Sequence, residues 1–368
     1  MAALRRLRRP RTGSEHMSTV LPGLTSFTNP SPCVEEVACP KCGSGDKSCV
    51  LQGCDRLHHI PGKYSVSECR RCGLWFQNPR PVRSCLGDLY PADYQPHAPV
   101  SPQAASASPP PSTARYLRRR LGYEHLSPGE NTGFDWRSWA VFEPIRKWSA
   151  GVNLVPSYAP DARLLEIGCG NGGRLLELRN LGWRRLYGIE LQPRAAAIAE
   201  ASGFSVQCGR IEDLLDAVPD AFFDVVVSSM VLEHLLNPFD TVRRLAAKIR
   251  PGGRFLFSTV TRDGLDARIY GTYWRNLDLP RHLTLFRRAD IRDMLAGAFE
   301  RVEMFYDAAA IDFVGSARFR RCECKRILDA LLISLGEARV KYASIVLAFL
   351  GRTSRVSVRC VRTASDGF

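Results

Sequence analysis

From about residue 160 onward, short apolar runs alternate with longer segments in which apolar positions recur at helical spacing. The short runs are typical of buried strands, and the helical spacing is typical of amphipathic helices. Because helices alternate with these strands, the pattern predicts a doubly wound, mostly parallel α/β sheet with right-handed crossovers. Residues 355–363 alternate apolar and polar side chains and predict a last, antiparallel strand. The parallel strands are predicted at 163–170, 185–191, 204–209, 222–232 and 254–260.

The chain before this pattern has a different composition. In residues 33–94, the part up to residue 80 is rich in Cys, Gly and Pro and has little helical periodicity. Residues 95–113 are rich in Pro, Ser and Ala. We therefore expect a small module at 33–94, a linker without a core at 95–113, and the α/β domain at 114–368. Residues 1–32 are expected to be a disordered arm, or to include sequence ahead of a true start at Met17.

The formal net charge of +14 would suit a nucleic-acid partner, so the position of this charge matters. Five arginines against one glutamate in residues 1–16 give a local charge of +4 and leave +10 for the remainder. No apolar run reaches the ~18 residues of a membrane span. Because no signal peptide is recognisable and four of the cysteines form two close pairs, we expect a cytoplasmic protein.

Two pairs of cysteines predict a metal site. Two residues separate Cys39 from Cys42, and a glycine follows Cys42. The same spacing and a following glycine are found for Cys69 and Cys72. Two residues between thiolates let both reach one tetrahedral ion, so we expect structural Zn²⁺ bound by all four. Four thiolate ligands leave no open position, and we expect no catalytic role for the metal.

A glycine-rich turn follows the first predicted strand. Gly168, Gly170 and Gly173 fit the GxGxxG pattern of dinucleotide sites, in which glycines permit a sharp turn and the close approach of a ligand. Glu190 follows at the end of the second strand, where it is positioned to bind ribose hydroxyls. Glu166 lies two residues before Gly168 and is placed to help hold the cationic amino group of a methionine moiety.

Five segments over residues 160–260 together carry a family resemblance. LLEIGCGNG, YGIEL, GRIEDL, FDVVVSSMVLEHL and RPGGRFLFS closely resemble the class I S-adenosylmethionine-dependent methyltransferase superfamily in order and spacing. This resemblance implies a Rossmann-like, doubly wound, seven-stranded methyltransferase sheet, preceded here by a small zinc ribbon, with S-adenosylmethionine as cofactor. For the two consecutive acids at 212 and 213, a solvated pair at a helix start is the alternative. The implied cofactor-binding residues are Glu166, Gly168, Cys169, Gly170, Gly172, Glu190, Leu191, Ile211, Glu212, Asp213 and Ser228.

The cysteine-rich module carries a second resemblance. CRRCGLWFQNPRP, followed by LYPADY, resembles the zinc-ribbon leader of a bacterial methyltransferase group associated with polysaccharide or cell-surface glycan biosynthesis. This resemblance implies a glycan-related acceptor.

Two histidines are candidates for acid–base chemistry on the acceptor. His234 follows the fourth strand and His282 the fifth, so both are expected near the carboxyl edge of the sheet, where ligands bind in such folds. YWRNLDLPRHLTLF resembles the acceptor-side loop of the family, which implies pocket roles for Trp274, Arg281 and His282. We expect His282 to be the general base and His234 the second candidate. The alternatives are a histidine hydrogen-bonded within its loop and, for His234, helix capping or packing.

Residues 318–352 hold eight basic and three acidic residues among amphipathic apolar positions. A helical insertion packed on the core is one interpretation, and peripheral contact with an anionic membrane that holds a lipid-linked acceptor is the other.

The sequence thus predicts O-methylation of a glycan, lipid-linked sugar or small-molecule acceptor. An RNA methyltransferase is one alternative, in which the ribbon binds phosphates through basic residues near two aromatic ones. A sugar C-methyltransferase and a non-enzymatic cofactor-binding scaffold are the others. The residues that an RNA site would use are Lys41, Lys47, Arg70, Arg71, Trp75 and Phe76.

Overall fold

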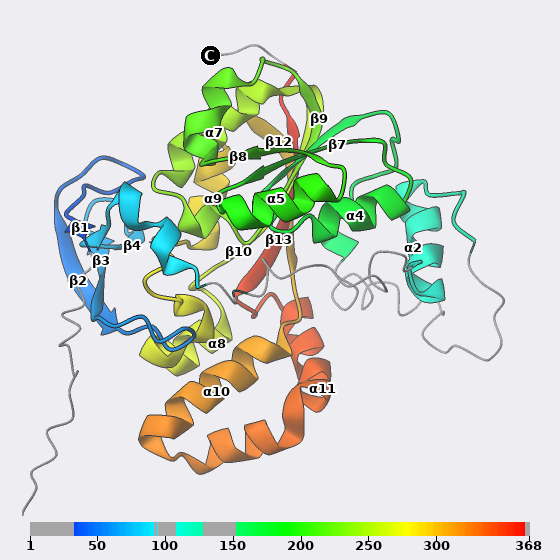
Figure 1. Cartoon of the computed structure of the whole chain (residues 1–368). Coiled ribbons are helices and arrows are strands. Elements are labelled where there is room, and N and C mark those ends of the chain that lie inside the picture. Colours follow the sequence, from blue (N-terminus) through cyan, green and yellow to red (C-terminus); the bar gives the residue numbers. More distant parts are fainter. Residues whose placement is uncertain (1–32, 92–93, 95–107, 128–151, 365–368) are drawn as a thin grey trace, which may run out of the picture. The chain divides into compact units, whose positions relative to one another are not determined.

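A computed structural model of the chain describes residues 33–91, 94, 108–127 and 152–364 (Figure 1). The expected arm at 1–32 and most of the expected linker lie outside these residues. Helix α2 (Pro111–Leu121) begins inside the segment expected to be linker, with a proline in its first turn, where no amide hydrogen is needed. The boundary between linker and α/β domain remains a prediction.

A seven-stranded sheet forms the larger part of the structure, as the sequence predicts. Its strand order is β12-β13-β10-β9-β6-β7-β8, and β13 runs antiparallel to both of its neighbours. The other pairs, from β10 to β8, are parallel, so their carboxyl ends share one edge. The strands are β6 (Arg163–Ile167), β7 (Arg185–Glu190), β8 (Ser205–Cys208), β9 (Phe223–Ser229), β10 (Ile249–Val260), β12 (Phe299–Tyr306) and β13 (Arg355–Arg362).

Apolar side chains on both faces of the central strands explain why these segments lack simple alternation. Leu164 and Val225 pack with helix α4 on one face, whereas Leu165 and Val226 pack with α7 and α9 on the other. Burial on both faces is typical of parallel sheets covered by helices. The helices that follow the strands are α4 (Gly173–Asn180), α5 (Pro193–Ala201), α6 (Ile211–Leu214), α7 (Pro238–Lys248), α8 (Leu265–Tyr270), α9 (Arg288–Leu295), α10 (Ala310–Cys324) and α11 (Ile327–Phe349).

Strand β12 has no counterpart among the strands predicted from hydrophobic pattern. It forms the edge of the sheet, and its residues after Phe299 are exposed or half-buried. A strand that buries few side chains needs no apolar alternation, so its sequence carries little signal.

The cysteine-rich segment forms two small sheets. β1 (Val34–Glu35) pairs with β5 (Arg80–Pro81), and the second sheet has the order β11-β4-β3-β2. The last strand of this second sheet, β11, comes from the far end of the acceptor-side loop and pairs with β4. The segment therefore shares a sheet with the α/β part of the chain. The strands of this sheet are β2 (Lys47–Gly53), β3 (Tyr64–Cys69), β4 (Trp75–Gln77) and β11 (Thr284–Leu285).

The two parts also share a core. Cys39, Leu74 and Phe76 are buried in the same cluster as Ile291 and Leu295 of α9. Near this cluster the ammonium of Lys41 donates to Asp290 on α9 at 2.7 Å. Apolar contact and an ion pair thus hold the cysteine-rich segment on the α/β part.

None of the helices in the described ranges is both long enough and apolar enough to cross a membrane.

Candidate functional site

The glycine-rich turn after β6 has a backbone that requires glycine. Gly168, Gly170 and Gly172 have φ of +70°, +54° and +83°, a region that other residues rarely adopt. A side chain at position 168 would also place its Cβ 2.5 Å from the side chain of Val231. The turn therefore leaves an open backbone surface at the carboxyl edge of the sheet.

A first cavity lies over this turn. Six of the predicted cofactor-binding residues line it, and both His234 and Arg281 from the expected acceptor side also reach it. The cavity extends across the ends of β6, β7 and β9, which is where parallel α/β sheets bind nucleotides. The six predicted residues that line this cavity are Gly168, Gly170, Glu190, Leu191, Ile211 and Glu212.

The remaining predicted residues lie behind the cavity lining. Cys169 is buried and would clash with any side chain at Gly188, and Gly172 precedes α4. Asp213 pairs with Arg83 and lies 3.9 Å from Arg210, so it faces cations instead of the cavity. Glu166 and Ser228 also lie outside the lining and are fully buried.

Glu166 and Ser228 each hold a buried oxygen without a hydrogen-bond partner in the described structure. Oε1 of Glu166 lies 3.7 Å from Nε of Arg174, while its Oε2 is unpaired. Burial raises the pKa of Glu166 to about 8. Unpaired buried acceptors beside an open glycine turn suit a ligand that carries amino and hydroxyl groups, as S-adenosylmethionine does.

Glu190 lies at the end of β7, where the sequence predicts a ribose ligand. Its Oε2 accepts from the amide of Gly170 and its Oε1 from the amide of Gln192, both at 2.8 Å. These two bonds fix the carboxylate beside the glycine turn, so it is held ready to bind hydroxyls.

One wall of the first cavity comes from the cysteine-rich segment, and sequence reasoning did not predict it. Leu86, Leu89, Tyr90 and Tyr94 line this wall. The hydroxyl of Tyr90 lies 3.2 Å from Nδ1 of His234. The LYPADY motif had indicated only a resemblance, because nothing local in it shows that its tyrosines reach a site elsewhere in the chain.

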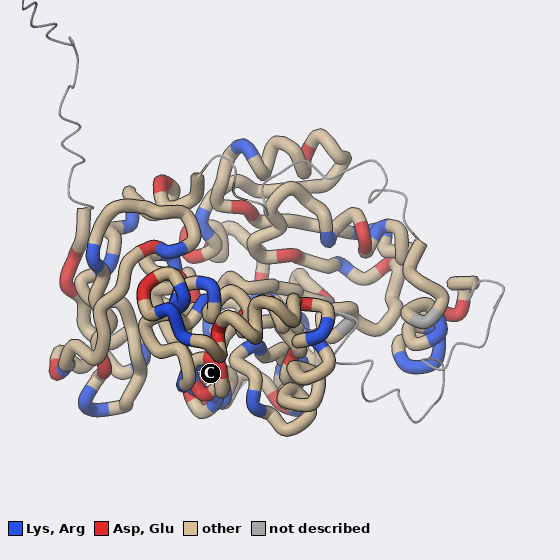
Figure 2. The backbone as a smooth tube through the Cα atoms, turned by 90° about the horizontal axis from the view of Figure 1, so that it is seen from below, with Lys and Arg blue, Asp and Glu red and all other residues tan. Residues whose placement is uncertain are grey.

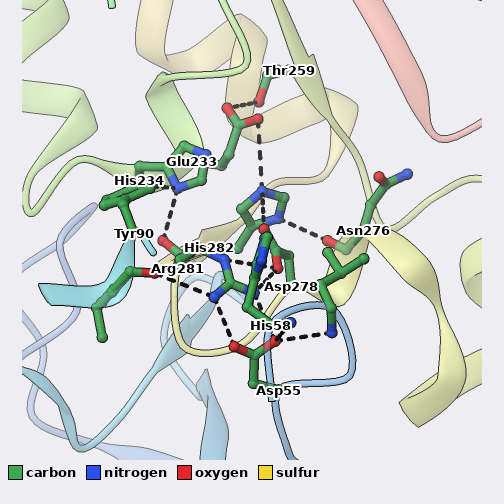
Figure 3. Close-up of polar contacts among 12 residues, drawn as sticks. Asp55, His58, Tyr90, Glu233, His234, Thr259, Asn276, Asp278, Arg281 and His282 are labelled. Carbon is green, nitrogen blue, oxygen red and sulfur yellow. Dashed lines mark hydrogen bonds and ion pairs between the residues drawn. The ribbon is translucent and has the colours of Figure 1, made fainter. Parts of the chain in front are cut away.

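The two candidate histidines lie side by side in a buried network (Figure 3). Nδ1 of His234 lies 3.0 Å from the Arg281 carbonyl, and Nδ1 of His282 donates to the Asn276 carbonyl at 2.8 Å. Nε2 of His282 lies 4.0 Å from the buried carboxylate of Glu233. Burial lowers the pKa of His234 to about 4 and also lowers the pKa of His282. His234 lines the first cavity, whereas His282 does not.

Arg281 connects the network to the cysteine-rich segment. Its guanidinium donates two hydrogen bonds of 2.8 Å to the carboxylate of Asp55 in the β2–β3 loop, and it also binds Asp278. Burial opposes ionisation of Asp55, but Arg281 holds the pKa of this carboxyl below its usual range. Trp274, the other residue expected in the acceptor pocket, is buried and donates to Asp266 at 2.9 Å.

A second cavity, of about 580 Å³, adjoins the first at the same sheet edge. Ser229 and Met230 at the end of β9 line both cavities. This volume is typical of small-molecule sites. The lining of the second cavity mixes apolar residues with polar ones, and the polar ones include Asn153, Arg174, Ser258, Asp307, Lys341 and Ser357.

Asp307, directly after β12, is one of two carboxylates in the lining of the second cavity, together with Glu337, and sequence reasoning missed it. It accepts from Nδ2 of Asn153 at 2.7 Å and from the hydroxyl of Ser357 at 2.6 Å. Burial raises the pKa of Asp307, and the two hydrogen bonds only partly offset this effect. A fixed carboxylate of raised pKa in the lining of a cavity is suited to accept a proton.

The four predicted metal ligands converge. The Sγ atoms of Cys39, Cys42, Cys69 and Cys72 all lie within 4.8 Å of one another, and the closest pairs are 3.5 Å apart. Tetrahedral zinc with Zn–S bonds of ~2.3 Å places sulfurs about 3.8 Å apart, so this donor set fits the ion. In each pair the following glycine donates its amide to the carbonyl of the first cysteine.

Comparison with known proteins shows which family the chain resembles. Residues 141–298 match the family described as "Methyltransferase domain". A ubiquinone biosynthesis O-methyltransferase of Pseudomonas syringae pv. tomato is 35% identical over 178 residues, which cover 45% of this chain and 75% of the relative. That of Ralstonia nicotianae is 31% identical, over 38% of this chain and 65% of the relative. A solved S-adenosylmethionine-dependent methyltransferase from Archaeoglobus fulgidus, 17% identical, covers 61% of this chain and 100% of its own, with a TM-score of 0.40.

Proposed function

Because the chain belongs to the S-adenosylmethionine-dependent methyltransferases, we propose that it methylates a hydroxyl oxygen of a glycan, a lipid-linked sugar or another small acceptor. The glycine turn, Glu166 and Glu190 would hold the cofactor in the first cavity. The relatives described above are named as O-methyltransferases, which supports oxygen as the methylated atom.

The second cavity is the observation that carries this proposal. It adjoins the first cavity through Ser229 and Met230, so an acceptor bound there lies beside a cofactor bound over the glycine turn. Its serine, asparagine and charged side chains offer hydrogen bonds to a polyhydroxylated molecule.

Bound S-adenosylmethionine supplies a methyl group on a sulfonium, which is open to displacement by a nucleophile. The protein must then align the acceptor oxygen and remove its proton. Asp307 is placed to accept this proton at one of its carboxylate oxygens. Asn153 and Ser357 hold the carboxylate in position by donating to both oxygens.

The two histidines are a second candidate for the base. His234 reaches the first cavity and His282 lies behind it, so His282 would have to act through His234. The lowered pKa of His234 makes this imidazole a weak proton acceptor. These features favour Asp307.

The contacts of the cysteine-rich segment disfavour RNA as the acceptor. Lys41 pairs with Asp290 and Asp293, Lys47 pairs with Glu36, and Arg70 lies 3.8 Å from Asp46. Phe76 is buried, and the guanidinium of Arg262 covers the ring of Trp75. Figure 2 shows basic and acidic positions interspersed along the described chain. Of the four basic residues, only the exposed Arg71 has no acidic neighbour among the described residues. The segment therefore offers little of the phosphate-binding surface that the RNA alternative requires.

The proposed role of Zn²⁺ is structural. Cys39, Cys42, Cys69 and Cys72 would hold the ion, whose closed thiolate shell fixes the two cysteine turns. These turns anchor the segment that continues to the tyrosine wall of the first cavity.

Incubation with methyl-labelled S-adenosylmethionine and a fractionated cell extract tests the acceptor class. We expect label in the glycan, lipid or small-molecule pools, in a base-stable linkage typical of an ether. Label confined to nuclease-sensitive material would replace the proposal with the RNA alternative. Label on carbon would replace it with the C-methyltransferase.

A further inference from the structure

Helices α10 and α11 form a hairpin beside the second cavity. The inner face of α10 packs into the core through Phe313, Val314 and Ala317, and α10 also packs against α8 (Figure 1). From α11, Val340 joins the same cluster. The hairpin is therefore fixed to the body of the protein by one side only.

The other side of the hairpin presents large apolar residues to solvent. Ile327 and Leu328 at the start of α11 are 78% and 76% exposed. Leu331 and Leu335 extend this face at helical spacing, as far as the kink at Gly336. A second exposed row follows the kink, and so many large apolar side chains in one region mark an interaction surface. The second row consists of Tyr342, Val346, Phe349 and Leu350.

The charges on the hairpin are unbalanced toward positive. Its four acidic residues are all paired: Asp312 with Arg355, Glu323 with Arg56, Asp329 with Arg320 and Glu337 with Arg318. Five exposed cations have no acidic partner within the described ranges. These five cations are Arg321, Lys325, Arg326, Arg339 and Lys341.

We propose that this hairpin surface docks on an anionic lipid bilayer. A helix surface that combines large apolar side chains with cations is suited to the interface, where apolar groups enter the acyl boundary and cations meet anionic headgroups. A second copy of the chain is a poorer occupant, because a symmetric contact would bring these unpaired cations against themselves.

The hairpin also forms part of the second cavity. Ile311, Glu337, Ala338 and Lys341 belong both to the hairpin and to the lining of the second cavity. Docking therefore brings the second cavity to the bilayer surface, where a lipid-anchored acceptor is held. This consequence rests on the proposed function, whereas the docking itself does not.

Flotation of the purified, zinc-loaded full chain with vesicles tests the docking without any acceptor. We expect binding to vesicles of phosphatidylcholine mixed with phosphatidylglycerol, and weaker binding to phosphatidylcholine alone. The double variant Leu328→Glu/Leu331→Glu should lower the bound fraction at least about tenfold, and Lys325→Gln/Arg326→Gln should remove the preference for anionic vesicles. These substitutions are at exposed positions, so circular dichroism and cofactor affinity should not change.

Val302→Glu is the matched control, because Val302 is 37% exposed on β12 and outside the hairpin. It should leave vesicle binding unchanged. Absence of binding by the folded wild type, or equal binding by the double variant, would overturn the proposal. So would a lipid-independent dimer, seen by light scattering, that the double variant abolishes. If the protein floats with vesicles but transfers no methyl group, the docking proposal stands and the proposed function fails.

Discussion

Among single residues, Glu166 is a buried carboxylate beside the glycine turn, behind the lining of the first cavity. A buried carboxylate with one unpaired oxygen is costly to ionise, and burial raises its pKa to about 8. Glu166 is therefore mostly protonated at neutral pH in the protein without ligand. A cationic amino group beside it would favour the ionised form.

We predict that binding of S-adenosylhomocysteine, which carries the same amino group, releases a proton at pH 7. Because the ligand prefers the carboxylate, its affinity should rise with pH up to about 8 and then level off. Titration calorimetry in buffers of different ionisation enthalpy measures this proton. Glu166→Gln should abolish the release, and equal release by the variant would assign the proton elsewhere.

The residues that sequence could and could not predict differ in a physical way. Gly168, Gly170 and Glu190 belong to a local motif, because the turn and the strand end themselves form the site. Tyr90 and Asp307 act through their position in the fold, and nothing near them in the chain indicates a cavity. A carboxylate at a strand end becomes a candidate only once the neighbouring strands are known.

At the scale of elements, the buried pair of Asp55 and Arg281 connects the β2–β3 loop to the acceptor-side loop. Both side chains are fully buried. Without Asp55, the buried Arg281 guanidinium would keep Asp278 as a carboxylate partner but would lose the charged acceptor of two of its hydrogen bonds.

Asp55→Asn should therefore lower the free energy of unfolding by about 1–3 kcal/mol. Asp46→Asn removes the exposed contact with Arg70 and should cost about 0–1 kcal/mol. Denaturant unfolding of both variants checks the prediction. Equal stability of the two would mean that the buried pair does not hold the loops together.

The cysteine turns and the tyrosine wall of the first cavity belong to one segment of chain. We predict that removal of the metal with a chelator weakens S-adenosylhomocysteine binding at least about tenfold, because the segment loses its fixed structure. Cys42→Ser should have the same effect, while Cys322→Ser, at an exposed cysteine outside the cluster, should not. Metal analysis and calorimetry measure both quantities. Full affinity in metal-free protein would dismiss this coupling.

Element prediction succeeded where burial is two-sided. β6 and β9 are apolar because both of their faces are covered, whereas β12 is an edge strand and lacks that pattern. The segment at 318–352 was expected to be either core-packed or membrane-facing. Helices α10 and α11 pack one side into the core, as the first interpretation predicts, and leave other apolar residues exposed; contact with a membrane stays a prediction.

At the scale of the whole molecule, both cavities lie at one edge of the seven-stranded sheet. The cysteine-rich segment supplies a wall of the first cavity, and the hairpin supplies part of the second. The sequence predicted the cysteine-rich module as a unit apart from the α/β domain. The pairing of β11 with β4 joins segments far apart in the chain, so no local pattern indicates it. Their integration depends on contacts that have no local pattern.

In the proposed function, the second cavity holds the acceptor and Asp307 removes its proton. The decisive measurement is the rate at which Asp307→Asn transfers methyl groups to the labelled acceptor pool. The affinity for S-adenosylhomocysteine is measured on the same protein. We predict that transfer falls about 10²–10³-fold while affinity changes less than about twofold, and that the acidic limb of the wild-type pH profile, set by the raised pKa of Asp307, is lost. The opposite result would be undiminished transfer by Asp307→Asn and a loss of about 10²–10³-fold in His282→Ala. It would contradict the role of Asp307 and return the role of base to the histidines.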